Sequence, residues 1–171
     1  GRSPFKPKLP FVPGYSIIGV VDAIGDDVTK AAVGDRVAAL TIHGGYTEYI
    51  FLGDKQLIPI PSTLNPVEAA PLILNYIVAY QTLHRTAKVK PGDKVLIIGA
   101  SGGIGTAFLQ LGKLANLTMY GIASKSKHDI LTEYGATPIY YHTQDFVEVI
   151  QTAEPEGLDV VFEGIGGDYF K

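Results

Sequence analysis

The chain has 171 residues, of which 46% are hydrophobic and 18% charged, a composition that excludes a disordered chain. Its net charge of −3 gives it no general attraction to nucleic acid or to an acidic membrane. It contains no cysteine, which excludes disulfides, thiolate catalysis and a zinc site with cysteine ligands. The four histidines are scattered without metal-ligand spacing, so we expect no metal site.

The first part of the chain has the pattern of short strands. Residues 15–25 are rich in β-branched side chains and end in a Gly-Asp-Asp turn, and a Gly-Asp turn precedes a second strand within 33–40. Two glycines then lead into 46–50, which alternates weakly between apolar and polar residues. The prolines of 58–61 exclude a central strand there, because they lack the amide hydrogen that a sheet needs. Short strands at this close spacing predict a small β-barrel or sandwich.

The second part alternates between helical and strand patterns. Asn65 is typical of a helix N-cap and Pro66 of the first helical position, and this helix is expected to run to about Arg85. Ser126 and Asp129 resemble a capping box at the start of a later helix. Strands are expected at 94–98, 117–123, 138–141 and 158–162, and further helices at 106–115 and 145–152. This alternation predicts a parallel sheet built from βαβ units.

A glycine-rich turn joins the strand at 94–98 to the helix that follows it. Three of its glycines stand three residues apart. The first permits a sharp turn out of the strand, the second lets the backbone approach a pyrophosphate, and the third lets the helix pack closely on the sheet. A tight structural turn is the alternative, but the strand before and the helix after favour a dinucleotide site. The residues of this glycine turn are Gly99, Ala100, Ser101, Gly102, Gly103, Ile104 and Gly105.

The segment after the next strand indicates which dinucleotide is bound. NAD-binding folds usually place an acidic residue there, which holds the ribose 2′-hydroxyl. Here the strand ends at Ala123 and is followed by Ser-Lys-Ser-Lys at 124–127, with no acid. The lysines and hydroxyls suit a 2′-phosphate, so the sequence predicts NADPH as the cofactor. A solvated loop with an N-cap serine is the alternative.

With these motifs the chain resembles the zinc-free quinone oxidoreductase branch of the medium-chain dehydrogenase/reductase superfamily. The resemblance covers essentially the whole chain in the family's order of motifs. The matching stretches are 9–14, 33–37, 44–49, 90–96, the glycine turn and 159–167. The resemblance implies an α/β fold, with a partial GroES-like β-domain over 1–75 followed by a partial Rossmann domain over 76–171. It also implies that the N-terminal part of the first domain and the C-terminal part of the second are missing.

The resemblance further implies a function. Members of this branch transfer hydride from NADPH to quinones or to activated alkenes such as enones and enals, without zinc, and they commonly form dimers. We therefore expect an NADPH-dependent oxidoreductase with a quinone or enone substrate, a homodimer, and no nucleic-acid or membrane partner. Because no signal peptide or membrane span is visible, we expect a cytoplasmic protein. A non-catalytic NADPH-binding or structural protein on the same fold is the alternative.

The resemblance assigns the phosphate contacts by position. The glycine turn would hold the pyrophosphate. Ser124 and Lys127 would meet the 2′-phosphate, and Tyr141 matches the tyrosine that packs near that phosphate in the family. An ordinary strand pair formed by Tyr140 and Tyr141 is the alternative explanation.

The remaining cofactor contacts are also assigned by resemblance. The turn formed by Glu163, Gly164 and Ile165 would approach the nicotinamide ribose, although Glu163 at a solvated strand end is the alternative. Asn75 and Val78 would line the nicotinamide pocket. Val78 stands where the family often has threonine, so we expect a polar contact to the cofactor to be lost.

The catalytic residues stay unassigned. No Ser/His/Asp arrangement is visible from spacing. Tyrosines in folded domains are most often core or interface aromatics. No proton donor is therefore assigned among the tyrosines of the first part and of the following helix, Tyr46, Tyr49, Tyr76 and Tyr80.

Overall fold

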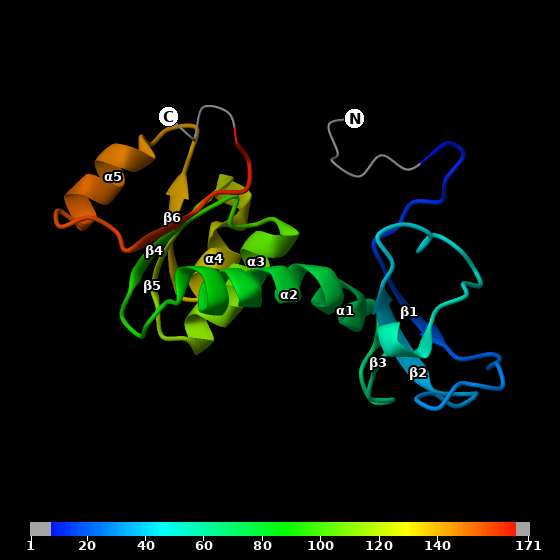
Figure 1. The fold of residues 1–171 in the computed structure, drawn as a ribbon. Helices are drawn as coiled ribbons and strands as arrows, with labels where there is room; N and C mark the ends of the chain where they lie inside the picture. Colours follow the sequence, from blue (N-terminus) through cyan, green and yellow to red (C-terminus); the bar gives the residue numbers. More distant parts are fainter. Residues whose placement is uncertain (1–7, 167–171) are drawn as a thin grey trace. The chain divides into compact units, whose positions relative to one another are not determined.

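The computed structural model describes residues 8–166 and divides the chain into two compact units, Gly1–Leu74 and Asn75–Lys171. The first unit contains an antiparallel sheet and the second a parallel sheet flanked by helices (Figure 1). This order of sheets confirms the expected α/β fold class. The resemblance over 159–167 ends at Gly167, which lies outside the described residues.

The antiparallel sheet of the first unit has the order β1-β2-β3. Its strands are β1 (Ser16–Val20), β2 (Arg36–Leu40) and β3 (Ile58–Pro59). Ile18 pairs with Ala38 in the middle of the register, and the central strand β2 is buried at Val37, Ala38 and Ala39. The short β3 lies at the edge, which agrees with the exclusion of a central strand by its prolines.

Two expectations for this unit are wrong. The segment 46–50 forms no strand, because the hydroxyl of Thr47 donates to the carbonyl of Tyr49 at 2.8 Å, a local turn that competes with strand pairing. Instead of a barrel or sandwich, the described part of the unit has one three-stranded sheet. Three strands are too few to close on themselves.

A run of helical turns covers residues 66–87, and the boundary between the two units falls within it. It consists of α1 (Pro66–Pro71), a π-helical turn (Leu72–Tyr76), α2 (Ile77–Tyr80) and a second π-helical segment (Gln81–Ala87). Asn65 is the N-cap, as expected, because its side chain accepts a 2.9 Å hydrogen bond from the N–H of Val67. The run ends at Lys88, whose φ of +54° is left-handed, just beyond the expected Arg85.

The second unit is built on a four-stranded parallel sheet with the order β6-β5-β4-β7. Its strands are β4 (Lys94–Ile98), β5 (Thr118–Ala123), β6 (Ala136–Tyr140) and β7 (Val160–Phe162). β4 is the first of them in sequence and lies inside the sheet, with β5 and β6 on one side and β7 on the other. The strand order therefore reverses between β4 and β7. In open α/β sheets, ligands bind at such a switch point, outside the carboxyl ends of the strands.

Helices cover both faces of the parallel sheet. They are α3 (Gly103–Leu114), α4 (His128–Glu133) and α5 (Phe146–Ala153). Val95 of β4 belongs to a core cluster with Leu131 of α4, whereas the next residue, Leu96, belongs to a second cluster with Ile150 of α5. Figure 1 shows α5 apart from α3 and α4. Alternate residues of β4 are thus buried on opposite faces, which explains its unbroken apolar run.

Two helix starts differ from those expected. α3 begins at Gly103 and not at 106, because the N–H of Thr106 already donates to the carbonyl of Gly102 at 2.7 Å. The capping box at Ser126 is wrong. Residues 125–127 form a 3₁₀ turn, so Lys127 takes the N-cap position of α4 and no side chain caps that helix.

A hydrogen-bonded cluster lies near the amino end of β4. Glu154, directly after α5, accepts a 2.6 Å hydrogen bond from the hydroxyl of Tyr120 and forms an ion pair with Lys94. Lys94 and Tyr120 hold the pKa of Glu154 below its ordinary value, and the bond to Glu154, with burial, raises the pKa of Tyr120 to about 12. Lys94 is the first residue of β4, so this cluster lies at the end of the strand that faces away from the glycine turn.

Candidate functional site

The carboxyl edge of the parallel sheet gathers most of the residues expected at the site. The pairing register places the last residues of β5, β6 and β7 within one position of Ile98, the last residue of β4. The segments that leave β4, β5, β6 and β7 at this edge begin with Gly99, Ser124, Tyr141 and Glu163. Residues separated by more than sixty positions in the chain therefore share one edge, beside the switch point of the sheet.

The glycine turn leaves β4 through Gly99, whose φ of +77° is left-handed and favours glycine. The N–H of Ala100 continues the ladder by donating to the carbonyl of Ile122 at 3.1 Å. The N–H of Gly102 then donates back to the carbonyl of Gly99 at 3.0 Å, which closes the turn. Gly102 is the N-cap of α3, so the chain passes from strand to helix within four residues.

The first turn of α3 presents unpaired backbone donors. The bond from Thr106 to Gly102 is the first one of the helix. The N–H groups of Gly103, Ile104 and Gly105 therefore have no helical acceptor. Together with the positive end of the helix dipole, they make this turn suited to an anion such as a pyrophosphate.

At two glycines of the turn, an added Cβ atom would lie closer than 3.0 Å to a neighbouring atom. A Cβ atom on Gly105 would lie 2.3 Å from the carbonyl oxygen of Gly99 and 2.7 Å from the Cα of Ala100, both backbone atoms. A Cβ on Gly103 would lie 2.6 Å from the amide nitrogen of Asn75. Gly105 thus lets α3 pack against the turn, and Gly103 lets Asn75 lie against the first residue of α3.

Asn75 lies against the glycine turn, and its expected contact with a nicotinamide ring stays a prediction. Its half-buried carboxamide forms no hydrogen bond to any residue within 8–166, so its polar atoms are available to a ligand. Val78 lies one helical turn further along, in α2, and is also half-buried. The contact of Val78 with a nicotinamide ring stays a prediction.

The segment 124–127 follows β5 as a 3₁₀ turn with Ser124 as its N-cap. The N–H of Lys127 donates to the carbonyl of Ser124 at 2.9 Å, and the hydroxyls of Ser124 and Ser126 lie 3.3 Å apart. Lys125 and Lys127 are exposed, and their ammonium groups form no ion pair with the described residues. This arrangement offers hydroxyls and free cations to a phosphate, but it is also that of a solvated turn.

Tyr141 follows β6 and is 42% exposed. Its ring contacts His142, with centroids 4.3 Å apart, and Tyr140, at 5.9 Å. Tyr140 in turn meets the ring of His128 edge-on at 6.1 Å. The rings therefore lead from Tyr141 toward α4, which follows Lys127 directly. Within the described residues the buried Nε2 of His128 has no partner, so this imidazole is held by packing.

Glu163 shapes the turn after β7. Its Oε1 accepts hydrogen bonds from the N–H of Ile165 at 2.5 Å and of Gly166 at 2.6 Å, so the carboxylate closes its own turn. The side chain of Ile165 lies 3.2 Å from the position that a Cβ on Gly99 would occupy. Gly164 has open space around it. The structure thus brings Ile165 onto the glycine turn and gives Glu163 a local structural role.

The sequence analysis did not identify a hydrogen-bonded link beside the turn. The hydroxyl of Tyr76 donates to Oε1 of Gln110 at 2.5 Å, and Nε2 of Gln110 donates to the hydroxyl of Tyr134 at 2.8 Å. The sequence does hold a sign of this link, because Gln110 is a neutral amide in a mainly apolar helix, seven residues after Gly103.

Tyr46, one of the tyrosines described above as most often core or interface aromatics, is 77% exposed and belongs to no core.

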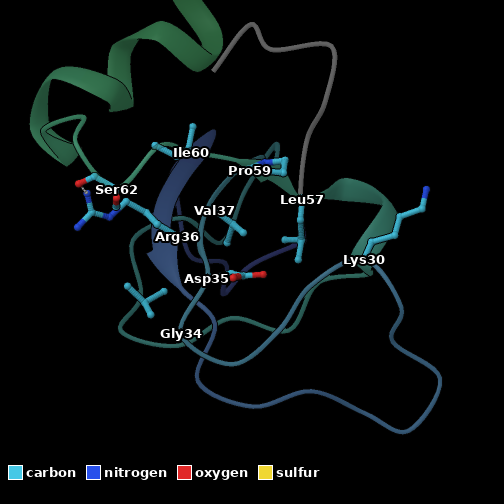
Figure 2. Close-up of a pocket in the computed structure, with 10 residues that line it drawn as sticks. Lys30, Gly34, Asp35, Arg36, Val37, Leu57, Pro59, Ile60 and Ser62 are labelled. Carbon is cyan, nitrogen blue, oxygen red and sulfur yellow. Dashed lines mark hydrogen bonds between the residues drawn. The ribbon is translucent and has the colours of Figure 1, made fainter.

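A cavity of about 370 Å³ lies in the first unit, and none of the expected site residues lines it (Figure 2). Two of its three charged side chains, those of Asp35 and Arg36, already bind the backbone. Arg36 donates to the carbonyls of Ser62 at 2.9 Å and Leu64 at 3.0 Å, and Asp35 accepts from the N–H of Ala32 at 2.8 Å. These groups stabilise the surrounding loops, so we assign no ligand to this cavity.

Metal-ligating clusters and membrane-spanning helices are both absent from the part of the chain that the structure describes. Over residues 8–166, no three or more His, Cys, Asp or Glu side chains are placed to hold a metal ion. In the same part of the chain, no helix has the length and apolar character needed to cross a bilayer.

Comparison with known families gives two matches along the chain. The family described as alcohol dehydrogenase GroES-like domain matches residues 1–62, and the family described as zinc-binding dehydrogenase matches residues 103–171. The second match begins at the first residue of α3. The chain has no cysteine, and no cluster of metal-ligating side chains is found among the residues that the structure describes.

Individual proteins match over nearly the whole chain. The synaptic vesicle membrane protein VAT-1 homolog of Rattus norvegicus is 42% identical over 94% of this chain and 40% of its own length. The Escherichia coli quinone oxidoreductase complexed with NADPH superposes with a TM-score of 0.92 at 25% identity, over 98% of this chain and 52% of that one. A 2-haloacrylate reductase superposes with a TM-score of 0.82 at 35% identity, over 94% and 52%. The chain thus spans about half the length of these proteins or less.

Proposed function

Because the chain belongs to the medium-chain dehydrogenase/reductase superfamily, in its quinone oxidoreductase and VAT-1 branch, we propose that it binds NADPH and transfers hydride to a quinone or an activated alkene. The observation that carries this proposal is the glycine turn. Its donors are unpaired, and a Cβ on Gly105 would overlap the backbone of the turn. A turn of this shape at the switch point of a parallel sheet suits a dinucleotide pyrophosphate.

The cofactor would lie along the carboxyl edge of the parallel sheet. The N–H groups of the first turn of α3 would hold the pyrophosphate, and Ser124 and Lys127 would hold the 2′-phosphate beside Tyr141. Asn75 would offer its unpaired carboxamide to the nicotinamide half. The turn that starts at Glu163 would approach the nicotinamide ribose, and the two N–H bonds to its carboxylate fix the shape of that turn.

The chemistry requires little of the protein beyond binding and orientation. When bound, NADPH supplies the hydride, and the residues of this edge hold the nucleotide in a defined pose. We assign no acid or base in this chain, and we propose a zinc-independent reaction. Quinones and activated alkenes are proposed as substrates because relatives named for a quinone and for 2-haloacrylate share the fold over this chain.

The preference for NADPH can be tested by titration. We expect the protein to bind NADPH more tightly than NADH in fluorescence titrations. Replacing Lys127 by glutamine should weaken NADPH binding about tenfold, because a charge-assisted hydrogen bond contributes roughly 1.5–3 kcal/mol, and should leave NADH binding nearly unchanged. Lys55→Gln, an exposed lysine of the first unit, is the matched control. Tighter binding of NADH than of NADPH contradicts the 2′-phosphate assignment.

A second function is favoured by one observation. The relative with 42% identity is named for a membrane compartment and not for a reaction, which fits a non-catalytic NADPH-binding protein on the same fold. NADPH oxidation in the presence of a small quinone or enone separates the two functions. Turnover supports the reductase, and tight NADPH binding without turnover in the natural full-length protein supports the alternative.

Association into a homodimer is part of the same proposal. It rests on the resemblance to a family that commonly forms dimers. Light scattering of the purified protein measures the mass directly. A single protomer mass at micromolar concentration contradicts the dimer and leaves the cofactor assignment intact. Action in the cytoplasm also remains a proposal.

A further inference from the structure

The link between Tyr76, Gln110 and Tyr134 joins three helical elements through one amide side chain. Oε1 of Gln110 accepts from Tyr76 at 2.5 Å, and Nε2 donates to Tyr134 at 2.8 Å. All three side chains are half-buried. A tyrosine hydroxyl is protonated at neutral pH and can donate, and burial, together with the neighbouring Tyr134, raises the pKa of Tyr76 further. Each partner thus has a defined role, and a directional network of this kind fixes helices more narrowly than apolar packing does.

On one side, the link sets the position of Asn75. Gly103 and Gln110 are seven residues apart, so they lie on the same face of α3, about 10 Å apart along its axis. Asn75 lies against Gly103, and the next residue in the chain, Tyr76, bonds to Gln110. Two consecutive residues therefore contact α3 two turns apart. These contacts prevent the helical run from sliding along α3 and keep the Asn75 carboxamide at the N-terminus of α3.

On the other side, the link sets the position of the segment 124–127. Tyr134 is the C-cap of α4, and α4 directly follows the 3₁₀ turn that contains Lys127. Because α4 is only six residues long, its position is transmitted to Lys127 across less than two helical turns. A shift of Tyr134 relative to Gln110 would therefore move Lys127 relative to the first turn of α3.

We propose that Gln110 is a positioning residue of the dinucleotide site, which holds Asn75 in place through Tyr76 and Lys127 in place through Tyr134. This inference rests on the proposed binding of NADPH. The two hydrogen bonds of Gln110 act on different parts of the ligand. The bond to Tyr76 serves the nicotinamide half, which NADPH and NADH share, and the bond to Tyr134 serves the 2′-phosphate, which NADPH alone carries.

Three tyrosine-to-phenylalanine variants test this assignment. Tyr134→Phe removes only the bond on the α4 side and Tyr76→Phe only the bond on the α2 side. Tyr120→Phe is the matched control, because its hydroxyl bonds to Glu154 near the opposite edge of the sheet. Dissociation constants for NADPH, NADH and 2′,5′-ADP are measured by titration for each variant and for the wild type. Thermal midpoints report any general loss of stability.

The expected result is a split between the variants. Tyr134→Phe should weaken the binding of NADPH and of 2′,5′-ADP about 3- to 10-fold, which is the usual effect of losing one hydrogen bond. The same variant should change the dissociation constant for NADH by less than about twofold. Tyr76→Phe should weaken the binding of NADPH and the binding of NADH equally, and it should leave the dissociation constant for 2′,5′-ADP unchanged. Tyr120→Phe should lower the thermal midpoint without altering any of the three constants. General loosening of the fold would not produce this split.

Changes at Gln110 itself provide a rescue test. Gln110→Leu removes both bonds and should combine the two losses, whereas Gln110→Glu can accept from both tyrosine hydroxyls and should retain most of the affinity. Equal effects of all three tyrosine variants, or unchanged binding in Tyr134→Phe and Tyr76→Phe, overturn the positioning role of Gln110. Neither result contradicts the proposed binding of NADPH. A wild-type protein that binds neither nucleotide overturns the proposed function and this inference with it.

Discussion

Replacing Gly105 by alanine tests whether close packing of α3 against the glycine turn holds the N–H groups that would face a pyrophosphate. The added Cβ would lie 2.3 Å from the carbonyl oxygen of Gly99, whereas ordinary contacts begin at 3.4 Å, so the backbone must move by about 1 Å. Overpacking of this kind costs about 1–3 kcal/mol, and the better helix propensity of alanine offsets at most about 1 kcal/mol of it. We therefore expect the free energy of unfolding to fall by about 1–2 kcal/mol.

The same movement displaces the N–H groups that would face the pyrophosphate. Loss of one charge-assisted hydrogen bond corresponds to roughly 1.5–3 kcal/mol, so NADPH affinity should fall at least about tenfold. Titration with NADPH and denaturation in urea measure the two effects separately. Gly102→Ala, whose Cβ would lie 3.3 Å from the same oxygen, should give a smaller change. Gly25→Ala is the control, since no heavy atom lies within 4 Å of its Cβ position. Wild-type affinity and stability in Gly105→Ala would refute the reasoning.

Two further predictions concern stability. Lys94 and Tyr120 lower the pKa of Glu154 in the folded state, so the stabilisation by this carboxylate is present above its ordinary value of 4.5 and is lost as the pH falls through the lower, folded value. The difference in unfolding free energy between wild type and Glu154→Gln should therefore be constant near neutral pH and shrink in acid. A difference that does not change with pH contradicts the role of the charge. Leu131→Ala should cost about 2–5 kcal/mol, because this side chain is fully buried, whereas Leu114→Ala, at a residue 79% exposed, should cost less than about 0.5 kcal/mol. Similar losses in urea denaturation for the two leucines would contradict the assignment of the core.

Much of the candidate site could be predicted because its signals are local. The apolar run at 94–98, the glycines after it and the helical pattern that follows are neighbours in sequence, and together they fix a strand, a turn and a helix. The absence of an acid after Ala123 is equally local. The errors arose where several local structures compete. Ser126 fits a capping box by spacing, but a 3₁₀ turn over 125–127 displaces the cap.

The glycine turn and the link at Gln110 mark what the sequence by itself determined and what the tertiary structure decided. The sequence determined the α/β class, the alternation of strands and helices and the turn itself, because periodicity and glycine spacing act over a few residues. Only the tertiary structure placed Asn75 on Gly103 and connected Tyr76 through Gln110 to Tyr134, across 34 and 24 positions of the chain. Such contacts depend on how helices pack against one another. No local pattern specifies which face of α3 receives which neighbour.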